Sequence, residues 1–188
     1  MKDLTPTDDA ELLQRARTGD REAFGAIVVA HQAGALRLAT VICGDSTEAY
    51  DIVQESFVRA YRSLASVRSG EALRPWLMRI VANQAKNSRR GRSRRDVRHA
   101  RHAALRPADV EGPDSTAMSE LDAEKLFAAV SQLRDRDRAV IACRYFADMT
   151  EAEAAAVLGV ATGTIKSRTA RALGRLRVEL GEGWGVEP

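Results

Sequence analysis

Four side chains near the carboxyl end of the chain have the types and spacing that nucleic-acid recognition uses. Lys166, Ser167, Arg168 and Arg171 fall within six consecutive positions. Arginine and lysine pair with guanine acceptors in the major groove, and from the edge of a helix they reach backbone phosphates. This segment therefore predicts contact with double-stranded DNA.

A helical corner must position these side chains. Thr150 and Thr162 are suited to cap two successive helices, and Gly159 between them supplies a left-handed turn. The second helix has an apolar face made of Ile165, Thr169, Ala172, Leu173 and Leu176. Its opposite face carries Lys166, Ser167, Ala170, Arg171 and Gly174, flanked by Arg168 and Arg175. The pattern indicates a helix-turn-helix with a recognition helix, although an ordinary helical hairpin with a basic solvated side has the same pattern.

Positive charge is concentrated in two islands. Residues 86–106 hold nine basic residues and one acidic residue, and residues 163–177 hold five basic residues and no acidic one. Because the whole chain carries only +3, the remainder is acidic, at −10. Two basic islands in an acidic chain indicate a polyanion contacted at two places and an acidic surface left for another partner.

Length and composition exclude several classes of protein. A chain of 188 residues allows one domain or two small ones and excludes large multi-layer enzyme folds. The cysteines, Cys43 and Cys143, are too far apart in sequence for a disulfide framework or a paired zinc motif. The amino terminus lacks a secretory signal, and the longest uncharged run, residues 23–36, is too short to span a bilayer. We expect a cytoplasmic chain with no direct membrane insertion.

Apolar periodicity predicts an all-α fold with two small helical domains. In the first half, one helix runs from Asp20 to a stop at Gly44, and a second begins at Asp45. The core face of that second helix is expected to contain Val53, Phe57, Ala60, Tyr61 and Leu64. A third helix opens around Pro75. Helical periodicity is lost in residues 96–119 and resumes at Leu121, so we assign domains to residues 1–95 and 120–188, joined by a flexible basic linker.

The second of these helices also has a polar and acidic face. Asp51, Gln54, Glu55 and Val58 recur at steps of three and four, opposite the expected core. Periodicity alone favours a solubilising surface here.

The sequence resembles a known family at this helix and at several other places. Residues 51–57, DIVQESF, are similar to the core-binding motif in region two of bacterial sigma factors, and residues 73–83, LRPWLMRIVAN, to the segment that follows it. Residues 148–171 closely resemble region four. With only these two regions, the chain is identified as a member of the extracytoplasmic-function group of the sigma-70 family.

The resemblance implies a transcription initiation factor rather than an enzyme, with no cofactor and no metal. Asp51, Gln54, Glu55 and Val58 would dock on the clamp helices of the largest subunit of core RNA polymerase, and region four would meet the polymerase flap. An anti-sigma factor is an expected partner, and it would hold the protein inactive and could retain it at the membrane.

The resemblance also assigns two promoter-binding sets. The loop from Ala65 to Leu73 and the helix from Pro75 to Asn87 would read and hold open the minus-10 element, with Asn83 as a base contact and Trp76 in the core. The minus-10 set is Arg74, Arg79, Asn83, Lys86, Asn87 and Arg90. The minus-35 set is Thr164, Lys166, Ser167, Arg168, Arg171 and Arg175. The linker arginines, Arg92, Arg94, Arg95, Arg98 and Arg101, would pass through the polymerase cleft.

Two other functional classes explain less of the chain. A stand-alone helix-turn-helix regulator leaves the acidic face and the linker without a role. A nucleic-acid-modifying enzyme is not supported, because the sequence has neither a phosphate-binding loop nor a nucleophile paired with a base. His99 and His102 are three residues apart but have no third metal ligand nearby, and Cys43 and Cys143 are interpreted as small core or boundary residues.

Overall fold

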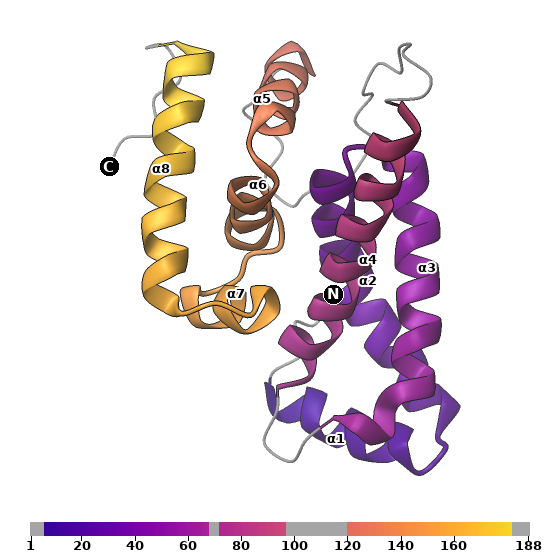
Figure 1. Cartoon of the computed structure of the whole chain (residues 1–188). Coiled ribbons are helices and arrows are strands. Elements are labelled where there is room, and N and C mark those ends of the chain that lie inside the picture. Colours follow the sequence, from indigo (N-terminus) through magenta and orange to yellow (C-terminus); the bar gives the residue numbers. More distant parts are fainter. Residues whose placement is uncertain (1–5, 68–71, 97–119, 182–188) are drawn as a thin grey trace.

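The computed structural model describes residues 6–67, 72–96 and 120–181, and it forms two helical units that pack side by side (Figure 1). No strand occurs within these ranges. The amino-terminal domain consists of α1 (Pro6–Arg17), α2 (Arg21–Cys43), α3 (Ser46–Ser63), the 3₁₀ turn η1 (Leu64–Ser66) and α4 (Leu73–Asp96). The carboxyl-terminal domain consists of α5 (Glu120–Gln132), α6 (Asp135–Ile141), the π-helical turn η3 (Ala142–Phe146), α7 (Glu151–Leu158) and α8 (Thr162–Leu180).

Helix α2 is the centre of the amino-terminal domain and packs against α1, α3 and α4. Its predicted limits are confirmed, because Asp20 Oδ1 accepts a hydrogen bond from the Ala23 amide at 3.0 Å and Gly44 ends the helix with φ 77°. By length and composition α2 resembles a membrane span, but half of its apolar window is buried inside the folded structure. The structure uses the helix as a core element.

Helix α3 begins at the predicted cap, but its buried face differs from the prediction, since Ala49, Ile52 and Ser56 are also buried and Tyr61 is not. Asp45 Oδ1 accepts from the Glu48 amide at 2.9 Å, and Val53, Phe57 and Ala60 are buried. The prediction for Tyr61 is wrong, because its side chain is 41% exposed, with its ring in an edge contact with Phe24 of α2.

Helix α4 buries its first turns and presents basic residues farther along. Pro75 lies in the first turn, where the missing amide proton costs nothing, and Trp76 is buried as predicted. Three of the predicted linker arginines are placed differently from the prediction, because Arg92, Arg94 and Arg95 lie on α4. Arg92 pairs with Glu48 of α3 and with Asp45, the N-cap of that helix. The predicted linker after Asp96 lies outside the described residues.

The carboxyl-terminal domain is organised around a buried arginine. Arg138 Nη1 donates to the Ser131 carbonyl oxygen at 2.8 Å, and Nη2 pairs with Asp135 Oδ1 at 2.5 Å. Burial, followed by repulsion from Arg89, lowers the pKa of Arg138 to about 10, so the side chain remains charged at neutral pH. These contacts stabilise the turn between α5 and α6, because the loss of any of them would leave the buried guanidinium partly unpaired.

Candidate protein and nucleic-acid interfaces

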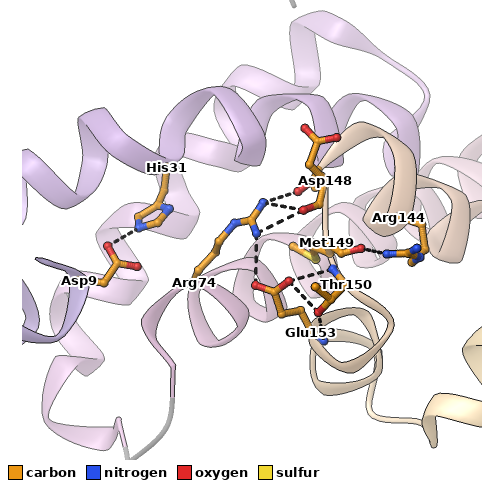
Figure 2. A network of polar contacts seen from close by, with 9 residues as sticks. Asp9, His31, Arg74, Arg144, Asp148, Met149, Thr150 and Glu153 are labelled. Atoms are coloured by element: carbon orange, nitrogen blue, oxygen red, sulfur yellow. Dashed lines mark hydrogen bonds and ion pairs between the residues drawn. The ribbon is translucent and has the colours of Figure 1, made fainter. Parts of the chain in front are cut away.

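Helices α7 and α8 form the predicted helix-turn-helix, and a capping box starts its first helix. The Glu153 amide donates to Thr150 Oγ1 at 3.2 Å, and the Glu153 carboxylate accepts from the Thr150 amide at 2.8 Å (Figure 2). Gly159 ends α7 with φ 66°, where a side chain would be strained. The Gly159 amide also donates to the Ala155 carbonyl oxygen, so the end of α7 at this corner is defined by local contacts.

The two faces of α8 are divided as the sequence predicts. Ile165, Ala172 and Leu176 are buried, whereas Lys166, Ser167 and Arg171 are exposed. The expected capping role of Thr162 is wrong, because Ala161 occupies the N-cap position and makes no side-chain bond. Thr162 is instead the first helical residue, so the amides at the start of the exposed recognition face have no side-chain cap.

The two arginines that flank this face have different surroundings. Arg175 Nη1 pairs with Asp137 Oδ2 of α6 at 2.5 Å. Arg168 is half-buried and lines a cavity between the two domains. Thr164, at the start of the set, is half-buried and its carbonyl oxygen accepts from Ser167. Lys166, Ser167 and Arg171 are therefore open to solvent, Arg175 is exposed but paired with α6, and Thr164 and Arg168 are partly buried.

The acidic face of α3 is exposed along its whole predicted length. Asp51, Gln54 and Glu55 are exposed, Val58 is 38% exposed, and Glu55 Oε1 pairs with Arg59 at 3.0 Å. An open groove of about 860 Å³ lies beside them. Its lining includes the side chains of Phe24, Val28, Gln32, Tyr50, Phe57 and Tyr61.

Sequence reasoning missed this groove. Tyr50 and Tyr61 are 54% and 41% exposed, and both line it next to Gln54 and Val58. The one sequence signal for this groove is an aromatic side chain at the edge of an apolar stripe. That signal does not distinguish a buried core residue from an exposed residue that lines a groove. The face of α3 thus combines acidic groups with exposed aromatic surface, a composition suited to protein contact.

The six residues of the minus-10 set are divided between solvent and the other domain. Asn83, Asn87 and Arg90 are exposed on α4. Arg74 and Arg79 instead contact the carboxyl-terminal domain, and Lys86 lines the cavity between the domains. Burial lowers the pKa of Lys86, and the neighbouring Arg90 and Arg168 add to this effect.

No set of metal ligands is found among the described residues. His99 and His102 lie outside them. Cys43 and Cys143 are buried free thiols, as predicted, and burial raises the pKa of Cys143 to about 12. A thiol this strongly protonated is a poor nucleophile and a poor ligand.

Comparison with known proteins gives matches in both halves of the chain. Residues 27–95 match the family model described as Sigma-70 region 2, and residues 129–178 match that of Sigma-70, region 4. The RNA polymerase sigma-H factor of Pseudomonas aeruginosa is 32% identical over 180 residues, covering 90% of this chain and 92% of the relative. The ECF RNA polymerase sigma-E factor of Salmonella typhimurium is 33% identical over 176 residues, covering 87% and 90%.

Two solved structures share the fold. CnrH in complex with the cytosolic domain of CnrY matches with a TM-score of 0.70 and 25% identity, covering 92% of this chain and 97% of that one. The sigma factor RpoE in complex with the anti-sigma factor NepR, from Bartonella quintana, matches with a TM-score of 0.66 and 27% identity, covering 84% and 96%.

Proposed function

The chain belongs to the sigma-70 family, in its extracytoplasmic-function group, and we propose on this basis which of its surfaces binds core RNA polymerase and which binds promoter DNA. The protein binds core RNA polymerase and directs it to specific promoters. The observation that carries this proposal is the occurrence, in one chain, of an exposed acidic face on α3 and an exposed basic recognition face on α8. A DNA-binding regulator needs only the second of these.

The face of α3 is the proposed contact with core polymerase. Asp51 and Glu55 supply negative charge, Gln54 supplies amide hydrogen bonds, and Val58 supplies apolar area. The aromatic side chains of the groove beside them would be buried against core polymerase when it binds, and such buried aromatic contacts strengthen an interface. Charge complementarity to a basic helical partner then sets the register of docking.

The two DNA-binding sets read separate elements. Lys166 and Arg171 donate to base acceptors of the minus-35 element in the major groove, while Arg168 and Arg175 hold phosphates. On α4, Asn83, Asn87 and Arg90 contact the opened minus-10 strand, joined by Arg74, Arg79 and Lys86 once these are free. Promoter opening draws on binding energy within the holoenzyme, and we assign no catalytic step to this chain.

An anti-sigma factor is the proposed regulatory partner, as in the complex of RpoE with the anti-sigma factor NepR. CnrH is likewise bound by another protein, the cytosolic domain of CnrY. Exposed polymerase-binding and DNA-binding faces need to be covered until a signal arrives. The proposed compartment is the cytoplasm, where polymerase and promoter DNA are found, with the anti-sigma factor able to retain the protein at the membrane.

Transcription in vitro tests the proposal. Purified bacterial core polymerase is assayed with and without the full chain on genomic fragments from the host. New start sites that appear only with the chain are expected. A chain that shifts DNA alone, does not bind core polymerase and adds no start site would instead be a stand-alone regulator.

A further inference from the structure

Cations from both domains line one cavity. The cavity has a volume of about 420 Å³ and lies between α4 of the amino-terminal domain and α6 and α8 of the carboxyl-terminal domain. Cavities that hold small ligands span roughly 300–1,000 Å³, so this one is large enough for a small molecule. Its cations come from three helices: Lys86, Arg89 and Arg90 from α4, Arg136 and Arg138 from α6, and Arg168 from α8.

The described lining contains one carboxylate, and this carboxylate is already paired. Asp135 Oδ1 lies 3.1 Å from Arg89 Nε and 2.5 Å from Arg138 Nη2. The other cations of the cavity make no ion pair within the ranges that the structure describes, namely Lys86, Arg90, Arg136 and Arg168. Like charges held together without a counter-ion repel one another, and the repulsion grows where the protein excludes water. The cavity therefore has an excess of positive charge that the described residues do not balance.

Lys86 shows the effect of this excess. Its side chain is half-buried, and burial lowers the pKa of its ammonium group. The charges of Arg90 and Arg168 lower this pKa further, so these two guanidinium groups lie within electrostatic reach of Lys86. An anion placed among the three side chains would reverse the effect, because it would stabilise the charged form of Lys86.

The lining of the cavity changes from exposed to buried residues. Arg90 and Arg136 are exposed. Lys86 and Arg168 are half-buried, and Arg138 is buried. A ligand can thus enter past the exposed cations and reach the half-buried ones. The described lining contains no aromatic ring, and its apolar side chains are those of Ile42, Ala139, Leu158 and Val160.

Promoter binding does not account for this cluster of cations. Three of them belong to the promoter-binding sets, but Arg89, Arg136 and Arg138 belong to neither set. A DNA duplex is too wide to enter a space of this size. A single strand is usually held by aromatic rings that stack on its bases, and the described lining has none. The cluster therefore fits a small anion better than it fits nucleic acid.

We propose that this cavity binds a short chain of linked phosphates, supplied as inorganic polyphosphate or as the polyphosphate part of a nucleotide. Linked phosphates carry several negative charges in a small volume, and guanidinium groups pair with phosphate oxygens through parallel hydrogen bonds. Arg90, Arg136 and Arg168 can donate such bonds from both domains. The ammonium group of Lys86 adds a point charge.

The bound anion also affects promoter contact. It occupies Lys86, Arg90 and Arg168, which we assign to the minus-10 and minus-35 elements, whereas the acidic face of α3 does not line the cavity. Polyphosphate therefore competes with promoter DNA and not with core polymerase. This competition rests on the proposed function, and the binding of polyphosphate does not.

Isothermal titration calorimetry of the full chain with sodium tripolyphosphate tests the binding. The titration is run at fixed ionic strength and without divalent cations, which would neutralise the phosphates. The test variant is Arg136→Ala, because Arg136 is exposed, makes no ion pair in the described ranges and belongs to neither promoter set. Arg134→Ala is the matched control, since Arg134 is also exposed on the same turn and does not line the cavity. Urea unfolding checks that both variants fold.

One tripolyphosphate is expected to bind to each wild-type chain. Orthophosphate and sulfate should bind at least about tenfold more weakly, because each offers one tetrahedral anion to cations from three helices. Arg136→Ala is expected to lower the affinity about tenfold, as one lost charge-assisted hydrogen bond does, and Arg134→Ala to change it by less than about twofold. Binding of ATP as tight as that of tripolyphosphate would assign the site to nucleotides, and weaker binding would assign it to inorganic polyphosphate.

Several results would overturn the proposal. Equal affinity for tripolyphosphate, orthophosphate and sulfate, or no binding of any of them, would show that no polyphosphate site exists. An unchanged affinity in the folded Arg136→Ala variant would place the anion elsewhere. A short DNA single strand of random sequence that binds more tightly than tripolyphosphate, with the same loss in Arg136→Ala, would make the cavity a nucleic-acid contact.

Transcription in vitro tests the competition. The chain is incubated with tripolyphosphate before core polymerase and promoter fragments are added, and any direct effect on polymerase is the same for wild type and Arg136→Ala. Half-inhibition of the variant is expected at about tenfold higher tripolyphosphate, in line with its lower affinity. Equal inhibition of both chains would overturn the competition. Absence of transcripts without tripolyphosphate would overturn the proposed function, and calorimetry would still decide whether the site exists.

Discussion

The Arg74 guanidinium and the Glu153 carboxylate form an ion pair across the two domains, with Nη1 3.2 Å from Oε1. The other oxygen of the same carboxylate accepts from the Thr150 amide and hydroxyl and so completes the capping box of α7. One side chain therefore links the start of the helix-turn-helix to the helix that carries the minus-10 set. Loss of the Glu153 charge would therefore weaken both the capping box of α7 and the ion pair with Arg74.

This double role gives a pH-dependent stability. Burial raises the pKa of Glu153, but the hydrogen bonds from Thr150 and the charge of Arg74 outweigh it, so the pKa lies below its usual 4.5. The stabilisation is thus present above pH 4.5 and is lost as the pH falls through the lowered value. Glu153→Gln should cost about 1 kcal/mol at pH 7 and less at pH 3.5, measured by urea unfolding. Glu151→Gln is the control, and an equal cost at both pH values would contradict the linkage.

Charge reversal on α3 should abolish polymerase binding without unfolding the chain. In Asp51→Lys/Glu55→Lys, both changed side chains are exposed, so the core is untouched while the acidic face becomes basic. Binding to core polymerase is measured by size-exclusion chromatography, with helicity checked by circular dichroism. The control Glu11→Lys/Glu179→Lys makes the same charge change at exposed sites elsewhere. Normal holoenzyme assembly by the folded α3 variant would reject this docking face.

The recognition face of α8 should contribute specificity rather than general affinity. Lys166→Ala or Arg171→Ala is expected to weaken holoenzyme binding to the minus-35 element by about 1–3 kcal/mol each, and to relax preference at one position. Affinities for matched and mutated promoter elements are compared at fixed salt. Arg177→Ala, on the last turn of the same helix, is the control. An equal loss on every sequence would make the residue a phosphate contact.

Trp76 should matter for stability rather than for base stacking. Its side chain is 7% exposed, so Trp76→Ala is expected to reduce the free energy of unfolding by about 3–5 kcal/mol, and Trp76→Phe by less. Urea unfolding followed by circular dichroism measures both. A stable Trp76→Ala protein that fails only in promoter opening would show that the ring acts on DNA instead.

The helices and their chemical faces were predictable because the signals that specify them are local. Asp20, Gly44 and Thr150 act through backbone groups within four residues, and the apolar steps of three and four define the buried face of α8 directly. The acidic face of α3 and the exposed cations of α8 follow from the same periodicity. At the edge of an apolar stripe, as at Tyr61, periodicity does not predict whether a side chain is buried, because its exposure depends on which other elements pack beside it.

Only the tertiary structure decided which of the predicted DNA-binding residues already make hydrogen bonds to the other domain. Arg74 and Arg79 look alike in the sequence, and their partners are mainly backbone carbonyls at residues 147, 148 and 156. Every residue carries a carbonyl, so no residue type marks these acceptors, and the left-handed turn at Asp148 that orients them is not a glycine position. The sequence by itself determined the helices, their faces and the family. The closure of one domain on the other depends on backbone geometry, which emerges only when both domains are folded and packed.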